Sequence, residues 1–179
     1  NFLLTSATPL LTMRLISEER KNQTLPFLFS APISLTEIVL GKFLGLVIFL
    51  SILVLYIFAM LATLNIWADI DFGYLLGNSF GLLLLIASFS ALGLYFSSLT
   101  SQPIIAAIST FLSLIAMGVL GNYFASDPGH WFGYISMTKH YQSFTRGVID
   151  SSDVIYFILF ITTFLTLTVR RLDSDRLSG

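Results

Sequence analysis

The residues that could perform chemistry in this chain of 179 residues are few and poorly placed. Residues 77–81 read Gly-Asn-Ser-Phe-Gly and match the G-x-S-x-G spacing in which serine hydrolases hold their nucleophile. That chemistry requires a strand–turn–helix setting for the serine, together with a histidine and an acid. Here Ser79 opens a long apolar stretch, and the two histidines, His130 and His140, occur in a later loop. These residues therefore give little support for a membrane-embedded hydrolase, which is the least favoured function for this chain.

Metal and nucleotide binding also find little support in the residues. His130 and His140, with Asp127, have no spacing that puts two ligands on one helical turn, so we expect both histidines to face solvent at a membrane interface. The chain contains no cysteine, which excludes disulfides and thiolate metal sites. It contains no G-x-x-x-x-G-K-[ST] phosphate loop. We therefore expect no catalytic residue, no cofactor and no metal on this chain, and any ATP must be bound by another protein.

The composition is that of a membrane protein. Hydrophobic residues make up 55% of the chain and charged residues only 11%, whereas a soluble domain carries about 25% charged residues. The net charge of −1 gives no reason to expect a nucleic-acid partner. The apolar residues form blocks of roughly 20 residues, the length that crosses a bilayer. We predict one membrane domain, an all-α polytopic bundle with spans at 41–66, 74–98, 103–124 and 154–169, preceded by the end of another span at 1–13.

Charges set the orientation and restrict the mechanism. Seven basic residues fall on one side of these spans and two on the other; the first set is Arg14, Arg20, Lys21, Lys42, Arg170, Arg171 and Arg176, the second Lys139 and Arg146. The positive-inside rule then puts 14–40, the turn at 100–102 and the tail at 170–179 in the cytoplasm. The number of spans places these segments together independently. No ionisable residue lies in the middle of a span, which argues against ion-coupled transport and favours a protein whose helices rearrange under an outside force.

Local signals mark several junctions. Ser34 and Glu37 have the spacing of a capping box ahead of the 41–66 span. Pro103 suits the first turn of the third span, and Ser152 or Asp153 can cap the last one, which Arg170 and Arg171 end. The segment 14–33 begins with charged residues and ends with apolar ones.

A second amphipathic segment is predicted at 137–149 on the outer side. Its apolar side chains are Met137, Tyr141, Phe144 and Val148, and its polar ones are Lys139, Gln142, Ser143 and Arg146. Such a helix lies at the membrane interface or dips into it.

Glycines recur at four-residue spacing in two spans. Gly41 and Gly45 form one pair, and Gly73, Gly77 and Gly81 form a longer series. In lipid, such glycines allow helices to approach closely. Both packing within the bundle and packing between subunits remain open for them.

The ordered polar residues resemble one family. Residues 9–20 (Pro-Leu-Leu-Thr-Met-Arg-Leu-Ile-Ser-Glu-Glu-Arg), Thr24-Leu25, 30–34 (Ser-Ala-Pro-Ile-Ser) and 37–42 (Glu-Ile-Val-Leu-Gly-Lys) resemble type-2 ABC-transporter permeases, and most closely the gliding-motility-associated branch. Residues 140–150 with Asp153, and the ending at 167–170, resemble the same branch. The resemblance covers essentially the whole chain.

The resemblance implies an exporter permease of the bacterial cytoplasmic (inner) membrane, with its C-terminus in the cytoplasm. It implies six spans, the first absent here, a second permease subunit and a separate cytoplasmic ATPase. A coupling helix at about Glu18–Ser30 would sit in a groove of that ATPase, although Pro26 stands where we expect an acidic residue. We assign ATPase coupling to Glu18, Glu19, Arg20, Thr24, Leu25, Phe27, Leu28 and Phe29, and the outer interfacial helix to His140, Phe144, Arg146 and Gly147. The main alternative is a structural membrane subunit with no transport path. The cargo stays open, because uncharged spans suit an amphiphile and tight helix packing equally.

Overall fold

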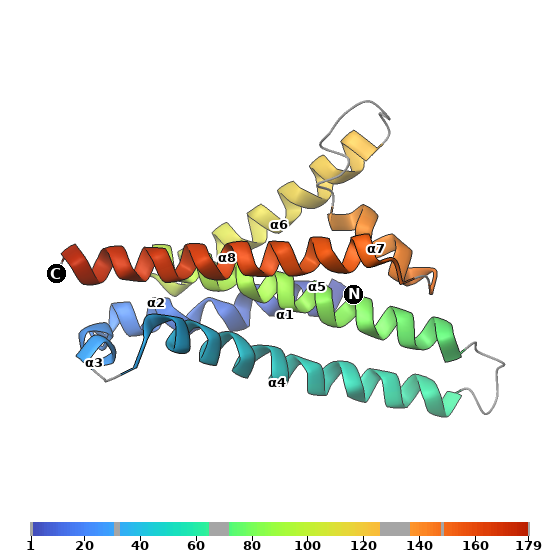
Figure 1. Ribbon diagram of the computed structural model, residues 1–179, viewed down its shortest axis with the longest axis horizontal. Helices are drawn as coiled ribbons and strands as arrows, with labels where there is room; N and C mark the ends of the chain where they lie inside the picture. The colour runs from blue at the N-terminus through green and yellow to red at the C-terminus, as the bar shows by residue number, and fades with distance from the viewer. Residues whose placement is uncertain (1, 31–32, 65–71, 126–136, 148, 179) are drawn as a thin grey trace.

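The computed structural model describes residues 2–30, 33–64, 72–125, 137–147 and 149–178, and these form helices without any strand (Figure 1). The elements are α1 (Phe2–Thr12), α2 (Arg14–Lys21), α3 (Leu25–Ser30), α4 (Leu35–Leu64), α5 (Phe72–Leu99), α6 (Pro103–Ala125), α7 (Met137–Thr145) and α8 (Ser151–Ser178). Among the described residues, the helices α4, α5, α6 and α8 are long and apolar enough to cross a membrane. The prediction of an all-α, polytopic membrane bundle is confirmed.

Helix α5 is the centre of the bundle. Its most apolar stretch is 72% buried, compared with 17–22% for the other three candidate spans, and it contacts α1, α4, α6, α7 and α8. Small residues permit this packing: a Cβ at Gly93 would overlap the Thr12 side chain of α1. Three buried serines of α5, Ser88, Ser90 and Ser98, donate their hydroxyl protons to carbonyls of the same helix; Ser90, for example, donates to the Ile86 carbonyl at 2.8 Å. The other spans therefore pack on one helix and turn their remaining faces outward.

The bundle has two different ends. One end holds α2, α3, the turn between α5 and α6, and the C-terminal part of α8; we call it the basic end (Figure 1). The other holds α7, packed on the first half of α5 and on the start of α8; we call it the α7 end. The segments that the basic residues and the span count placed on one side are thus together at the basic end.

The helices extend beyond the predicted spans. Helix α4 begins at Leu35, six residues before 41, because the capping box forms as expected: the Ser34 amide donates to Glu37 Oε2 at 2.8 Å, and the Glu37 amide to Ser34 Oγ at 3.3 Å. Helix α8 continues past Arg170 and Arg171 to Ser178. The arginines therefore end the apolar stretch but not the helix. Residues 65–71, which include the predicted end of the 41–66 span, lie outside the described residues.

The start of α8 differs from the prediction. The Ser152 amide donates to Asp150 Oδ1 at 3.1 Å, so Asp150 caps this helix. Asp153 is buried and contacts α7 instead, through His140. The predicted caps, Ser152 and Asp153, are wrong because α8 already begins at Ser151, so both lie within its first turn.

Helix α7 forms within the predicted amphipathic segment and ends at Thr145. Met137 and Phe144 are buried, and Tyr141 packs partly against the same cluster. After the helix, Gly147 takes a φ of +75° and lies close to α5, where an added Cβ at Gly77 would be 3.1 Å from its Cα. Val148 lies outside the described residues.

The glycine series divides into two groups. Gly77 and Gly81 pack within the chain, and a Cβ at Gly81 would overlap Phe144 of α7. Gly41 and Gly45 of α4 have no neighbour within 4 Å of an added Cβ, so no described part of this chain packs on them. Gly73 is exposed near the start of α5.

Candidate functional site

The junction between α1 and α2 is built around one serine of α5. Ser97 Oγ accepts the amides of Ile16 and Ser17, at 3.1 and 3.0 Å, and donates to the Met13 carbonyl at 3.0 Å. It therefore does for α2 what an N-cap residue normally does from within the same chain segment. Ser97 and Ser17 are fully buried, so these bonds are shielded from water. The start of α2 is held by the central helix.

Helix α2 is also tied to α4. Lys42 Nζ lies 2.6 Å from Glu19 Oε1 and donates to the Leu15 carbonyl at 2.7 Å. The Lys42 and Glu19 side chains are 21% and 29% exposed, so the pair is only partly screened by solvent. Both groups were predicted on the same side of the membrane, but their pairing was not.

A third tie joins α2 to α8. Arg20 forms an ion pair with Asp175, and Arg171 approaches the same carboxylate at 3.5 Å from one turn earlier on α8. Two cations share one anion here, which leaves the cluster with a positive charge. Because α8 continues as a helix beyond the membrane stretch, its last turns can reach α2.

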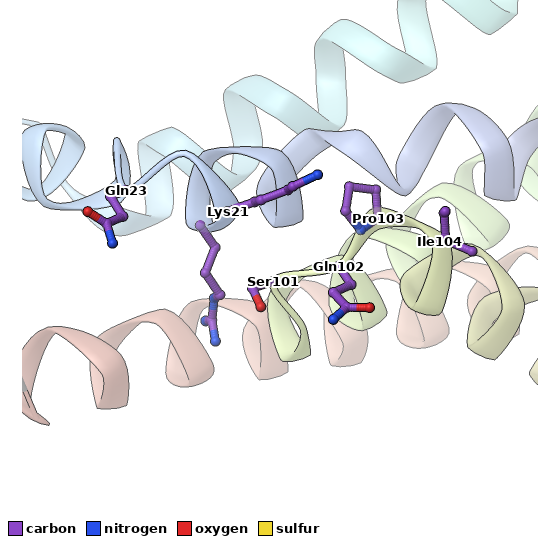
Figure 2. A pocket seen from close by; sticks show the side chains of 7 residues that line it. Lys21, Gln23, Ser101, Gln102, Pro103 and Ile104 are labelled. Carbon is purple, nitrogen blue, oxygen red and sulfur yellow. The ribbon is translucent and has the colours of Figure 1, made fainter.

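A polar pocket of about 520 Å³ lies between α2 and the turn that joins α5 to α6 (Figure 2). Its lining consists of Arg20, Lys21, Gln23, Ser101, Gln102, Pro103 and Ile104. Figure 2 shows Lys21 projecting from α2 beside Pro103 at the start of α6, with Ser101 and Gln102 in the turn. The lining has two cations and no carboxylate, and helix α6 begins there with its positive dipole end. The basic end thus presents a cationic hollow beside α2.

The predicted coupling segment forms two helices, not one. Helix α2 ends at Lys21 and α3 begins at Leu25, with Gln23 between them at a φ of +56°. Thr24 supports the break, since its hydroxyl donates to the Glu19 carbonyl at 3.1 Å and its own carbonyl accepts the amides of Phe27 and Leu28. Pro26 falls in the first turn of α3, where its missing amide is tolerated.

The residues assigned to ATPase coupling occupy different environments. Leu25 is 8% exposed and belongs to the core with Ile16 and Val39, so its side chain contacts other helices of this chain. Phe27, in contrast, is 77% exposed. Glu18 is exposed and Leu28 half-buried, while Glu19 and Arg20 are engaged in the ion pairs described above. The Phe29 side chain lies outside the described residues.

The candidate chemical sites of the sequence have structural roles or fall outside the described residues. Ser79 lies within α5, and its hydroxyl donates to the Leu75 carbonyl at 2.9 Å, so the G-x-S-x-G segment has no strand–turn–helix setting. His130 and Asp127 lie outside the described residues, and no metal-binding group of three ligands occurs among the residues that are described.

His140 does not face solvent as predicted. Its side chain is 16% exposed, Nδ1 lies 2.6 Å from Asp153 Oδ1, and its ring stacks on Tyr156 at 4.2 Å between centroids. This group joins α7 to α8. Arg146, from the same set, is exposed.

Three residues of the basic end were missed by the sequence reasoning: Ser97, Gly93 and Asp175. A serine inside an apolar helix gives no signal of a partner more than 80 residues away, and a lone glycine gives none either. Asp175 offered one weak signal, because an acid one turn after Arg171 predicts that the helix continues.

Comparison with known proteins gives one match. Residues 3–175 match the family model described as ABC-2 family transporter protein. No curated protein and no solved structure matches the chain.

Proposed function

We propose, from the premise that this chain belongs to the ABC-2 transporter family, that it is the permease subunit of an ATP-driven exporter and that a separate ATPase drives it through α2 and α3. Members of this family are the membrane components of ABC transporters, whose nucleotide-binding component is a partner. We further propose that transport is directed outward, that the ATPase contacts α2 and α3, that a second permease subunit is present and that the basic end lies in the cytoplasm.

One observation carries the proposal. Helix α2 is joined to three membrane helices at once: to α5 through Ser97, to α4 through Lys42 and to α8 through Asp175. A force applied to α2 therefore reaches three membrane helices without an intervening flexible segment. The capped start of α4 adds a rigid continuation towards the membrane. Such an element is suited to converting movement of a partner into movement of a bundle.

The surface offered to the ATPase is smaller than the sequence suggested. Phe27 is a large aromatic side chain left exposed at the basic end, and Glu18 lies on an exposed position of α2. Exposed aromatic residues in this setting are typical anchors of protein interfaces. Glu19 and Arg20 contribute by fixing α2 to the bundle rather than by contacting the partner.

The distribution of basic residues supports the orientation. Seven of the nine Lys and Arg residues are at the basic end by sequence and structure, which the positive-inside rule assigns to the cytoplasm, where ATP is available. The outward faces of α4 and α6, with Gly41 and Gly45 open on α4, leave room for a second permease subunit in the membrane. Membership of the gliding-motility branch is part of this proposal, and it rests on the resemblance of residues 9–42, of 140–150 with Asp153, and of 167–170.

The experiment is co-purification followed by a surface test. The tagged chain is purified from its native membranes in mild detergent, and we expect an ABC ATPase in the eluate by mass spectrometry. Phe27→Glu should then reduce the recovered ATPase about tenfold, because a charge replaces a buried apolar contact. Ile149→Glu is the control at the α7 end, where Ile149 is an apolar side chain that is 56% exposed, and it should leave the ATPase recovery unchanged.

Two results would contradict the proposal. Absence of any ATPase from the wild-type eluate would favour the structural-subunit alternative. Full ATPase recovery with both Phe27→Glu and Glu18→Lys would show that the partner contacts another surface.

A further inference from the structure

A groove lies between α4 and α8 near the basic end, apart from the pocket beside α2. Its volume is about 490 Å³, and its lining is Thr36, Val39, Leu40, Thr162, Leu165, Thr166, Val169 and Arg170. The two helices pack against each other, and the lining residues lie in the first turns of α4 and the middle of α8. Because both are membrane spans, the groove opens towards lipid rather than water.

The groove is apolar in spite of its three threonines. Val39 and Leu165 are buried and form its floor, while Leu40 is 44% exposed on its wall. The Thr162 hydroxyl donates to the Ile158 and Leu159 carbonyls, and the Thr166 hydroxyl donates to the Thr163 carbonyl at 2.8 Å. These hydroxyl protons are therefore used within α8, and the threonine methyl groups are left to line the groove.

One end of the groove carries an unpaired cation. Arg170 is exposed and forms no ion pair with any residue that the structure describes. Its neighbour Arg171 shares Asp175 with Arg20, so the only nearby ion-paired carboxylate of α8 already serves two guanidinium groups. A guanidinium holds a phosphate through two parallel hydrogen bonds.

The dimensions match one membrane leaflet. From Thr162 to Arg170, the lining of α8 rises by eight residue steps, or about 12 Å along the helix axis. Half of the hydrocarbon core is about 15 Å thick. A ligand whose phosphate lies at Arg170 would thus place an apolar chain along Thr166, Thr162 and the Leu165 floor.

We propose that this groove binds one anionic phospholipid from the leaflet at the basic end, with its acyl chain between α4 and α8 and its phosphate at Arg170. Charge complementarity selects an anionic headgroup, since the groove lining contains one cation, Arg170, and no carboxylate. The bound lipid would fill the space between α4, which α2 holds through Lys42, and α8, which α2 holds through Asp175. The site depends on membrane insertion and not on the proposed ATPase coupling.

The test is native mass spectrometry of the purified chain titrated with phosphatidylglycerol or with phosphatidylcholine of the same acyl chains. We expect one phosphatidylglycerol to bind at least tenfold more tightly than phosphatidylcholine. Arg170→Gln should weaken phosphatidylglycerol binding about tenfold, the loss of one charge-assisted phosphate contact. Thr166→Phe should abolish the single-site binding by filling the groove. Both positions are exposed, so neither change disturbs the core.

Matched controls come from the same chain. Arg14→Gln removes another exposed, unpaired cation of the basic end, and Thr163→Phe enlarges an exposed threonine of α8 that does not line the groove. Both should bind phosphatidylglycerol like the wild type, and circular dichroism should report equal helix content in all variants.

Each other result would overturn the proposal. Equal binding of the two lipids would remove the role of charge, and competition by glycerophosphoglycerol, which has no acyl chain, would show a phosphate site alone. If Thr166→Phe leaves lipid binding intact but dissociates a dimer, the groove is a subunit interface. ATPase co-purification is a separate measurement, so a negative result in the lipid-binding experiment does not contradict the proposed coupling to an ATPase.

Discussion

At the residue scale, a serine hydroxyl of one helix can accept the amide hydrogen bonds at the start of another helix. The amides of Ile16 and Ser17 belong to the first turn of α2, and both donate to Ser97 Oγ of α5. Ser97→Ala would leave two buried donors without their acceptor, and we expect it to lower the free energy of unfolding by about 1–3 kcal/mol. The measurement is unfolding of the purified chain in mild detergent by a denaturant titration.

Ser90→Ala is the matched control for this change. Ser90 is as buried as Ser97, but its hydroxyl bonds only to the carbonyl of Ile86 in its own helix. Its removal leaves no backbone amide unpaired, so we expect a change below about 0.5 kcal/mol. Equal losses for the two variants would show that Ser97 has no special role at the junction.

At the element scale, α7 and the residues after it pack closely on α5 because glycines of α5 have no side chain at the contact. A Cβ at Gly81 would overlap Phe144, and one at Gly77 would lie 3.1 Å from Gly147 Cα. We expect Gly81→Ala to destabilise the chain by about 1–3 kcal/mol through overpacking, and to increase protease cleavage near α7. Limited proteolysis with unfolding in detergent measures both effects.

Gly45→Ala tests the same change where α4 is open. No atom lies within 4 Å of a Cβ at Gly45, and alanine favours a helix over glycine by about 1 kcal/mol. The isolated chain should therefore be as stable as the wild type or slightly more so. If Gly45→Ala instead weakens an assembled dimer, that face of α4 is the subunit interface left open by the sequence. A large loss of stability in the monomer would contradict the packing described for α4.

At the scale of the whole molecule, the two ends should lie on opposite sides of the membrane. The chain has no cysteine, so single cysteines can report their side directly. In intact cells, a membrane-impermeant maleimide should label Gln142→Cys at the α7 end but not Ser101→Cys at the basic end. Both positions are exposed. After permeabilisation both should react; labelling of Ser101→Cys in intact cells would reverse the orientation.

The amino-acid sequence by itself determined the architecture in which this protein works. Blocks of about 20 apolar residues, a Ser34–Glu37 box and unequal basic residues depend only on local composition, spacing and the bilayer, so α4, α5, α6, α8 and the grouping of 14–40 with the C-terminal part could be predicted. The polar residues of 9–42 led to the family. The contacts of individual residues were harder to predict where their partners are distant in the sequence.

Only the tertiary structure decided which residues are buried in the bundle and which are exposed. Leu25 and Phe27 look alike in sequence, yet Leu25 packs in the core with Ile16 and Val39 whereas Phe27 is exposed. His140 is half-buried because Asp153 and Tyr156 of α8 contact it. Ser97, Lys42 and Asp175 likewise hold α2 because helices distant in sequence pack together there. Contacts between helices far apart in sequence arise from packing geometry, and neither composition nor periodicity encodes that geometry locally.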